Sequence, residues 1–458
     1  MYTPETVNSI PGHLLSESRE TAIIGVIALG MAAVSLYLGT IIFLLPDVTY
    51  GYGYHIAEWA VVIQSVVIAS LFIFFGRIGD QVSLPVIFRY GLILLTFGFL
   101  CTGLITHPYV YLLSSVLIAI ASAMVSAVAG GMIRSTLPLS RLPFGLAVMY
   151  LGACFGFIFG PSLVVLVSSL YSWNLFFLII APVSCIAAFL TGQVCDCTPS
   201  RISLWEMDLP GAGLLIITLF LLMYALVEVF SFTITPVVLL SGCMGIVMAL
   251  LLWFHQKRTE NPFLSSGWMK TPGIMHLVVL IVILVLVYRG AVFLSRIFLQ
   301  EMVWADPVIT GLILIIPGIT FIPLVFMIGT MAGSWNLKRF IRISIWGVIL
   351  GSLGAVAFGF FTQWSSILAL LCFGAYNACI RIPVCTLFFA RVSQHESGIA
   401  GGMLETCTAL VIPLIVPITG ASFHAGYTRL SLPPAGSCGM DEIIAHLFWG
   451  NLGDALFF

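Results

Sequence analysis

Long apolar segments separated by short polar connections make up most of this chain. A helix needs about 20 apolar residues to cross the ~30 Å hydrocarbon core of a bilayer, and most of the segments reach that length. Because a backbone in lipid must satisfy its own hydrogen bonds, the pattern predicts an all-α polytopic membrane protein with about 13 or 14 transmembrane helices. The expected spans lie near residues 21–45, 57–75, 86–106, 109–131, 144–168, 173–192, 209–230, 236–254, 273–298, 309–332, 340–361, 365–389 and 398–422.

The composition excludes a water-soluble protein. Of the 458 residues, 60% are hydrophobic and 8% are charged, whereas soluble domains carry roughly a quarter charged residues. Residues 1–20 are polar and lack the basic segment of a cleavable signal, so we expect a short tail followed by an uncleaved first span.

Lysine and arginine are distributed unevenly over the polar connections. Basic residues concentrate on the cytoplasmic side of membrane proteins, so we predict a cytoplasmic N-terminus, with residues 76–85 and 255–272 on the same side. With this orientation the outer side keeps little beyond Arg296 and Arg429. The inner side collects Arg19, Arg77, Arg89, Arg134, Arg141, Arg201, Lys257, Arg258, Lys270, Lys338, Arg339, Arg342 and Arg391.

The polar stretch from Gly76 to Pro85 separates the second and third apolar segments. Its charges cannot lie in hydrocarbon, so we expect a tight hairpin at the membrane interface. The order Gly76-Arg77-Ile78-Gly79-Asp80 resembles the first half of the signature loop between spans two and three of major facilitator superfamily transporters. The resemblance implies that Gly76 and Asp80 take part in closing the cytoplasmic gate.

Glycines recur at intervals of four residues in the fifth span, at Gly152, Gly156 and Gly160, and Pro161 follows. This spacing places the glycines on one helix face, where a neighbouring backbone can approach closely, and proline permits a kink. The stretch resembles the G-x-x-x-G-P motif of antiporters in the superfamily. The resemblance implies that this helix packs at the interface between the two halves of the protein.

Three further stretches resemble the fourteen-span drug:proton antiporter branch of the superfamily. The branch places two six-helix bundles around an inserted helix pair and works by alternating access. The similar stretches are Leu45-Pro46-Asp47 with Trp59, Trp173-Asn174-Leu175-Phe176-Phe177 with Pro182, and Leu299-Gln300 with Pro307, Gly311 and Pro317.

The resemblance implies a domain organisation and a function. We expect a tail at 1–20, a six-helix bundle at 21–192, an inserted pair with linkers at 193–272, and a second bundle at 273–458 whose last helix is short or incomplete. The expected protein is a monomer of the bacterial inner membrane. It would export a small, multidrug-like organic molecule, with a proton as coupling ion and no cofactor or nucleic acid.

The sequence also departs from that branch. In the second half of the signature loop, the family's Arg, Gly, Arg and Lys are replaced by Gln81, Ser83, Leu84 and Pro85. The membrane-embedded Asp and Arg of the branch fall on Tyr37 and Ser115. The residues expected to couple proton antiport are therefore missing from the N-terminal half. A non-transporting relative, or a uniporter or anion carrier without proton coupling, is the alternative.

Three charged residues lie well inside predicted spans of the C-terminal half: Arg289, Arg381 and Glu405. Charges in a membrane are costly and are functional candidates by default. They form an internal ion pair, or the guanidinium groups bind an anionic substrate, or Glu405 carries a coupling proton. Trp59 and Gln64 are further candidates for lining a cavity.

Nothing in the sequence indicates an enzyme or a metal site. The eight histidines are scattered, without an H-x-x-x-H pair or a nucleophile elbow. Cys195 and Cys197 are too close to form half of a zinc site without partners.

Overall fold

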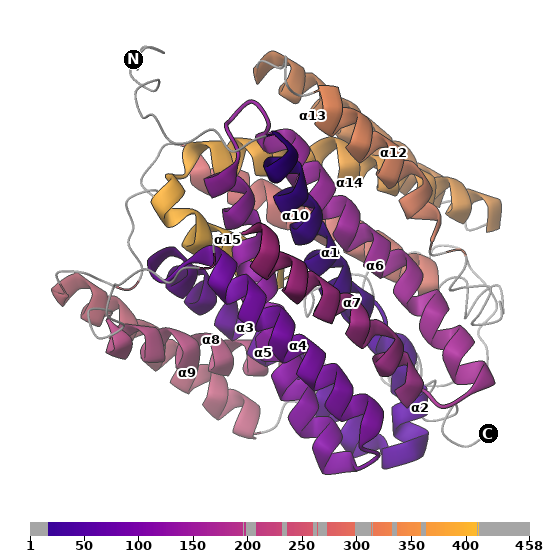
Figure 1. The fold of residues 1–458 in the computed structure, drawn as a ribbon, viewed down its shortest axis with the longest axis vertical. Coiled ribbons are helices and arrows are strands. Elements are labelled where there is room, and N and C mark those ends of the chain that lie inside the picture. The colour runs from indigo at the N-terminus through magenta and orange to yellow at the C-terminus, as the bar shows by residue number, and fades with distance from the viewer. Residues whose placement is uncertain are drawn as a thin grey trace.

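The computed structural model describes residues 17–195, 197, 208–230, 236–259, 263, 273–297, 313, 315–331, 337–358, 363–409 and 411, and over these residues the chain is helical without strands (Figure 1). The expectation of an all-α fold is confirmed. The helices are α1 (Glu17–Leu38), α2 (Ile41–Tyr52), α3 (Tyr54–Gln81), α4 (Leu84–Leu104), α5 (Pro108–Thr136), α6 (Leu142–Leu170), α7 (Asn174–Val194), α8 (Leu209–Phe230), α9 (Pro236–Arg258), α10 (Ile274–Ile297), α12 (Ile316–Met331), α13 (Leu337–Phe358), α14 (Gln363–Arg391), η6 (Gln394–Glu396) and α15 (Ser397–Ala409).

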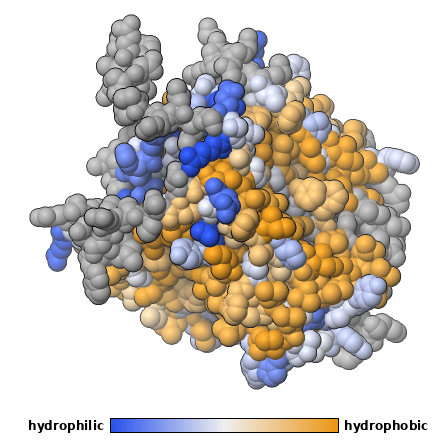
Figure 2. All heavy atoms as spheres, in the orientation of Figure 1, coloured by the Kyte–Doolittle hydropathy of each residue, from blue (hydrophilic) through white to orange (hydrophobic). Residues whose placement is uncertain are grey.

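Within the described part of the chain, ten helices are long and apolar enough to cross a membrane, and two shorter apolar segments lie at Ile316–Thr330 and Arg342–Ala357. A broad apolar surface crosses the visible face, with hydrophilic residues mainly at its upper left and lower edges (Figure 2). The protein is therefore an integral multi-pass membrane protein. Of the expected last span, 398–422, the structure describes residues up to 411 except 410, and the tail from 412 onward lies outside the described residues.

Two predicted boundaries differ from the structure. The expected first span breaks after Leu38, because the N–H of Thr40 bonds to the carbonyl of Tyr37 three residues back and tightens the turn (2.9 Å). The expected hairpin at 76–85 is mostly helix, since α3 continues to Gln81 and α4 begins at Leu84. Pro85 fits the first turn of α4, where a missing N–H costs no hydrogen bond.

The helices form two groups that meet along a seam. In one group α1 packs against α6 and α7. In the same group α4 packs against α5 and α7, and α5 packs against α3. In the other group α14 packs against α10, α12 and α13. The seam between the groups is formed by α15 against α3 and α5, and by α12 and α14 against α6.

The α8–α9 hairpin lies outside both groups and packs against α3 through α8 (Figure 1). Asp208 precedes α8, accepts the N–H of Gly211 (2.9 Å) and lies 2.7 Å from Nε2 of His255 on α9. Phe263, which is buried, stacks on Phe74 of α3 with ring centroids 6.2 Å apart. These contacts tie the hairpin to one end of α3.

That end of the molecule, called here the Asp80 end, gathers basic residues from several helices. Arg141 at the start of α6 bonds to Glu20 on α1 (2.6 Å), and Arg19 donates to the carbonyl of Val194 at the end of α7 (3.3 Å). Arg134 and Arg391 end α5 and α14 at the same side of the bundle, where α15 begins.

Candidate functional site

At the Asp80 end, the seam is closed by a carboxylate that caps a helix of the other group. The side chain of Asp80 on α3 accepts the backbone N–H groups of Gly398 (2.7 Å) and Ile399 (2.8 Å), in the first turn of α15. The first N–H groups of a helix lack partners within the helix and carry a partial positive charge. Asp80 therefore satisfies two of them across the seam, which gives the residue a specific contact that its sequence motif alone did not define.

Glycines allow the backbones to touch at this point. A Cβ placed on Gly76 would collide with the carbonyl oxygen of Gly398, and one placed on Gly402 would collide with the carbonyl of Phe72. A Cβ on Gly401 would lie 2.6 Å from the carbonyl oxygen of Ala127 on α5. The start of α15 is thus in backbone contact with both α3 and α5.

A second helix end is held by Arg134, which the sequence did not single out. Its Nε donates to the carbonyls of Phe389 (2.8 Å) and Val392 (3.3 Å) at the C-terminal end of α14. The last carbonyls of a helix carry a partial negative charge, which a cation stabilises. Ser397 adds a hydrogen bond to the carbonyl of Gly131 (3.2 Å). The partners are about 260 positions away in the chain, so no local pattern could reveal them.

The three charged residues predicted from the sequence come together from three helices. Arg289 lies on α10, Arg381 on α14 and Glu405 on α15, and all three interact electrostatically. Each is partly buried within the bundle. No nitrogen of either guanidinium lies within 4.0 Å of the Glu405 carboxylate, so neither arginine forms a direct ion pair with Glu405.

Two aromatic residues of α6, missed by the sequence analysis, contact these arginines from the other group. The Cζ atom of Arg381 lies 4.4 Å from the ring centroid of Tyr150, and that of Arg289 lies 5.5 Å from the ring of Phe157. The two rings are seven residues apart, about two helical turns, and so share a face of α6. The hydroxyl of Tyr150 also lies 3.3 Å from Sγ of Cys385.

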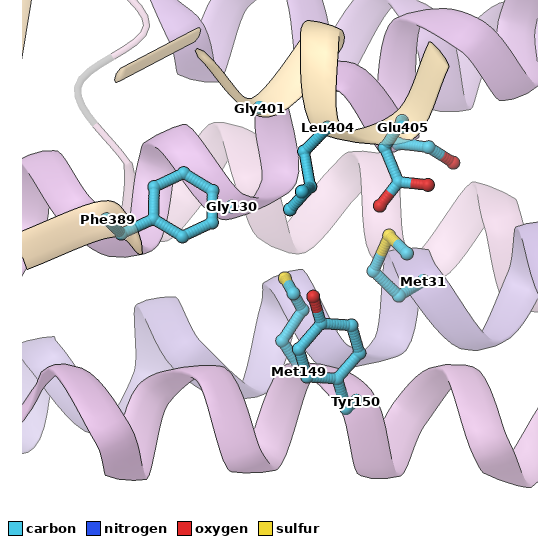
Figure 3. A pocket seen from close by; sticks show the side chains of 9 residues that line it. Met31, Gly130, Met149, Tyr150, Phe389, Gly401, Leu404 and Glu405 are labelled. Carbon is cyan, nitrogen blue, oxygen red and sulfur yellow. The ribbon is translucent and has the colours of Figure 1, made fainter. Parts of the chain in front are cut away.

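A small cavity lies beside this cluster, on the seam itself. In the close-up the carboxylate of Glu405 extends toward Met31, and the hydroxyl of Tyr150 points toward Leu404 (Figure 3). The volume of about 10 Å³ leaves room for about one water molecule. Helices of both groups supply the lining, which consists of Met31, Ser126, Gly130, Met149, Tyr150, Phe389, Gly401, Leu404 and Glu405.

The candidates of the N-terminal half lie elsewhere. Tyr37 and Gln64 are buried and bonded to each other, with the Tyr37 hydroxyl 2.9 Å from Oε1 of Gln64. The ring of Tyr37 packs against Phe99 and Phe177. The indole of Trp59 is 47% exposed. The structure therefore places the Tyr37–Gln64 pair in the packed interior of the first group.

The glycine face of α6 packs against α1. A Cβ on Gly152 would collide with the carbonyl of Ala28, and one on Gly160 would lie 2.6 Å from the carbonyl of Leu36, both on α1. Gly156 likewise packs against α1. The helix itself packs at the interface between the halves, against α12 and α14, as the resemblance implied. Its glycine face gives the predicted close backbone approach to α1, within its own group. The side chain of Pro161 lies outside the described residues.

Comparisons with known proteins agree with this architecture. Residues 27–192 match the profile of the Major Facilitator Superfamily. The chain is 22% identical over 432 residues to the Multidrug resistance protein Stp of Mycobacterium tuberculosis (strain CDC 1551 / Oshkosh), covering 91% of this chain and 78% of that protein. It is 20% identical over 378 residues to the Riboflavin transporter RibZ of Clostridioides difficile (strain 630), covering 82% and 80%.

Solved structures show the same fold. The human organic anion transporter MFSD10 (TETRAN) superposes with a TM-score of 0.65 at 13% identity, over 96% of this chain and 98% of that one. A bacterial homologue of the iron transporter ferroportin gives a TM-score of 0.58 at 13% identity, over 96% and 97%. The superfamily profile matches residues 27–192, and the overall fold is similar to that of these two transporter structures.

Proposed function

We propose that this protein is a secondary transporter that moves a small organic molecule across the membrane by alternating access. The carrying observation is the cluster of Arg289, Arg381 and Glu405, half-buried on the seam between two helix groups. Charged side chains within membrane spans are expensive and mark substrate or ion pathways, and transporters of this class bind near the midplane between two halves. The names of the relatives, a multidrug resistance protein and a riboflavin transporter, support a small organic substrate.

The contacts at the Asp80 end act as a reversible gate in this proposal. Rocking the groups apart would break the bonds of Asp80 to α15 and of Arg134 to α14. A helix cap contributes typically about 1 kcal/mol, and a charge at a helix terminus about 0.3–1 kcal/mol. Interactions of this size favour the closed state without locking it.

The proposal includes an orientation and a domain organisation. The Asp80 end faces the cytoplasm, because basic residues gather there, and the N-terminus lies on the same side. The two helix groups correspond to bundles at 21–192 and 273–458, and α8 and α9 to the inserted pair at 193–272. The transporter works as a monomer in a bacterial inner membrane and is not an enzyme. Export and exchange against protons rest on the sequence resemblance alone.

Glu405 is the proposed coupling group. It is a carboxylate on the seam, close to two arginines, so its charge changes the field in which the substrate binds. Tyr37, which occupies the position of the acid in the antiporter branch, has an unperturbed pKa of about 10 and does not ionise near neutral pH. The N-terminal group therefore offers no replacement at that position.

The proposal is tested in sealed vesicles that contain the full-length protein, with ethidium and benzoate as probes and with or without a pH gradient. We expect protein-dependent movement of a probe that responds to the gradient. Glu405→Gln should keep exchange of the probe and lose the response. If Glu405→Gln still concentrates the probe in response to the gradient, Glu405 is structural. If neither probe moves and the seam does not open in distance measurements, the non-transporting alternative is correct.

A further inference from the structure

We propose that the substrate is an organic monocarboxylate, bound through its carboxylate by the guanidinium groups of Arg289 and Arg381. The inference rests on the proposed function for the location of the site and adds the chemical class of the substrate. An anionic substrate would distinguish this protein from transporters of cationic drugs.

The first argument is the charge balance at the seam. Arg289 and Arg381 contribute two positive charges against the single negative charge of Glu405. The three groups interact electrostatically, but no guanidinium nitrogen lies within 4.0 Å of the Glu405 carboxylate. An uncompensated charge in a low-dielectric interior is costly unless a partner neutralises it. A bound monoanion adds negative charge beside the two arginines, whereas a cation would be repelled by them.

The second argument concerns the N–H donors of the guanidinium groups. Arg381 and Arg289 lie against the rings of Tyr150 and Phe157, with Cζ 4.4 and 5.5 Å from the ring centroids, and Arg381 also interacts with the Tyr150 hydroxyl. The Nε of Arg381 is buried and has no hydrogen-bond partner. A guanidinium presents parallel N–H donors that match the two oxygens of a carboxylate.

The third argument concerns the rest of the substrate. Next to the charged cluster, the seam cavity is lined by Met31, Met149, Phe389 and Leu404. Methionine side chains are flexible and polarisable, and so adapt to varied apolar shapes. At about 10 Å³ the cavity is too small for an organic molecule in this state, so an apolar or aromatic body of the substrate would reach this lining only when the two helix groups separate. A small dicarboxylate without an apolar part would leave this lining unused.

The fourth argument links the anion to a proton. Glu405 faces Arg289 on α10 and Arg381 on α14, with Tyr150 and Cys385 also within electrostatic range. On the side of α15 that packs against α3, the hydroxyl of Thr406, next to Glu405, donates to the backbone carbonyl of Ala69, and the carboxylate of Asp80 lies at the N-terminus of α15. A bound carboxylate competes with ionised Glu405 for the arginines, so protonation of Glu405 favours the anion. Anion and proton then move in the same direction, in contrast to the exchange expected from the sequence resemblance.

The test is a binding measurement, so it does not depend on transport. Thermal unfolding of the full-length protein in lipid nanodiscs is followed with benzoate, salicylate and hexanoate, each compared with its uncharged amide, and with benzylammonium. We expect stabilisation by carboxylates only, stronger at about pH 6 than at about pH 8. Arg381→Gln and Arg289→Gln should each weaken binding at least about tenfold, the effect of losing one charge-assisted hydrogen-bond partner.

Two kinds of variant keep the result interpretable. Arg342→Gln removes an exposed arginine on α13 and should bind as the wild type does. Arg381→Lys keeps the charge and should retain weakened binding even if the Gln variant folds poorly, whereas Glu405→Gln should bind tightly without pH dependence. The inference is overturned if amides or benzylammonium stabilise as well as the carboxylates, if no carboxylate stabilises the wild type, or if the arginine variants are unaffected. Carboxylate binding without movement in the vesicles would retain the site and reject the transport proposal.

Discussion

The two helix groups treat polar residues deep in the bundle in opposite ways. In the N-terminal group, Tyr37 and Gln64 are neutral, bonded to each other, and 1% and 2% exposed. In the C-terminal group, Arg289, Arg381 and Glu405 are charged, half-buried and without a direct ion pair. A neutral bonded pair can be enclosed at low cost, whereas charges must keep solvent or a ligand beside them.

The comparison indicates that the two helix groups have different roles. The N-terminal group is a packed scaffold that meets the seam with uncharged rings from α6 and closes one end through Asp80 and Arg134. The C-terminal group carries the charges that a substrate would meet. Substitutions in the first group should therefore act on folding or on the gate, and those in the second on substrate and coupling.

The largest effect is expected where scaffold packing is broken. Gly152→Leu would force a side chain into the backbone of α1, and overpacking of this kind typically costs about 1–3 kcal/mol and occasionally more. We expect a large loss of folded, monodisperse protein, measured by size-exclusion chromatography and thermal unfolding. Gly25→Leu on α1 is the matched control, because a Cβ there meets nothing within 4 Å. If Gly152→Leu folded normally but transported differently, the glycine face would contact the other helix group and not α1.

The next effect concerns the charged group. Arg381→Met should reduce transport in vesicles by about 10- to 100-fold, as expected for the loss of charge-assisted hydrogen bonds worth about 1.5–3 kcal/mol. Thermal stability should change little or rise, because a partly buried charge without a direct ion pair is replaced by an apolar side chain of similar length. Arg342→Met, at an exposed position of α13, should transport normally. Severe unfolding of Arg381→Met would instead mean that this arginine holds the bundle together.

The gate should respond less strongly. Asp80→Asn removes a negative charge from the N-terminus of α15 but keeps one acceptor oxygen, so we expect a loss of about 1 kcal/mol from the closed state. That corresponds to about a fivefold shift toward a longer distance between spin labels at Ser135 on α5 and Gln394 in η6, both exposed. Asp47→Asn on α2 serves as the control for a charge removed elsewhere. An unchanged distance distribution in Asp80→Asn would show that the cap does not control the seam.

Much of the fold could be predicted from the sequence, because lipid imposes a simple rule on long apolar helices. The three charged candidates were found for the same reason, since charges in such segments stand out. Their partners were not found: Tyr150 and Phe157 lie in an apolar span, where an aromatic residue carries no distinguishing signal. The contacts of Asp80 and Arg134 depend on backbone groups of distant helix ends, which side-chain patterns do not encode. The neighbour of the glycine face of α6 could not be predicted, because spacing defines a face but not the helix that packs on it.

The smallest effect is expected from the neutral pair, and it tests the comparison most directly. Tyr37→Phe removes the hydroxyl that bonds to Oε1 of Gln64, whose Nε2 is already buried without a partner. The amide would then have neither bond, at a cost of about 1–3 kcal/mol in stability. Adding Gln64→Leu should recover much of that loss, because removing both partners of a buried bond is close to neutral. Since neither residue carries charge, transport and its pH dependence should stay within about twofold of the wild type in both variants. If Tyr37→Phe abolished the response to a pH gradient as Glu405→Gln is expected to do, the N-terminal group would take part in coupling and the division between the two groups would fail.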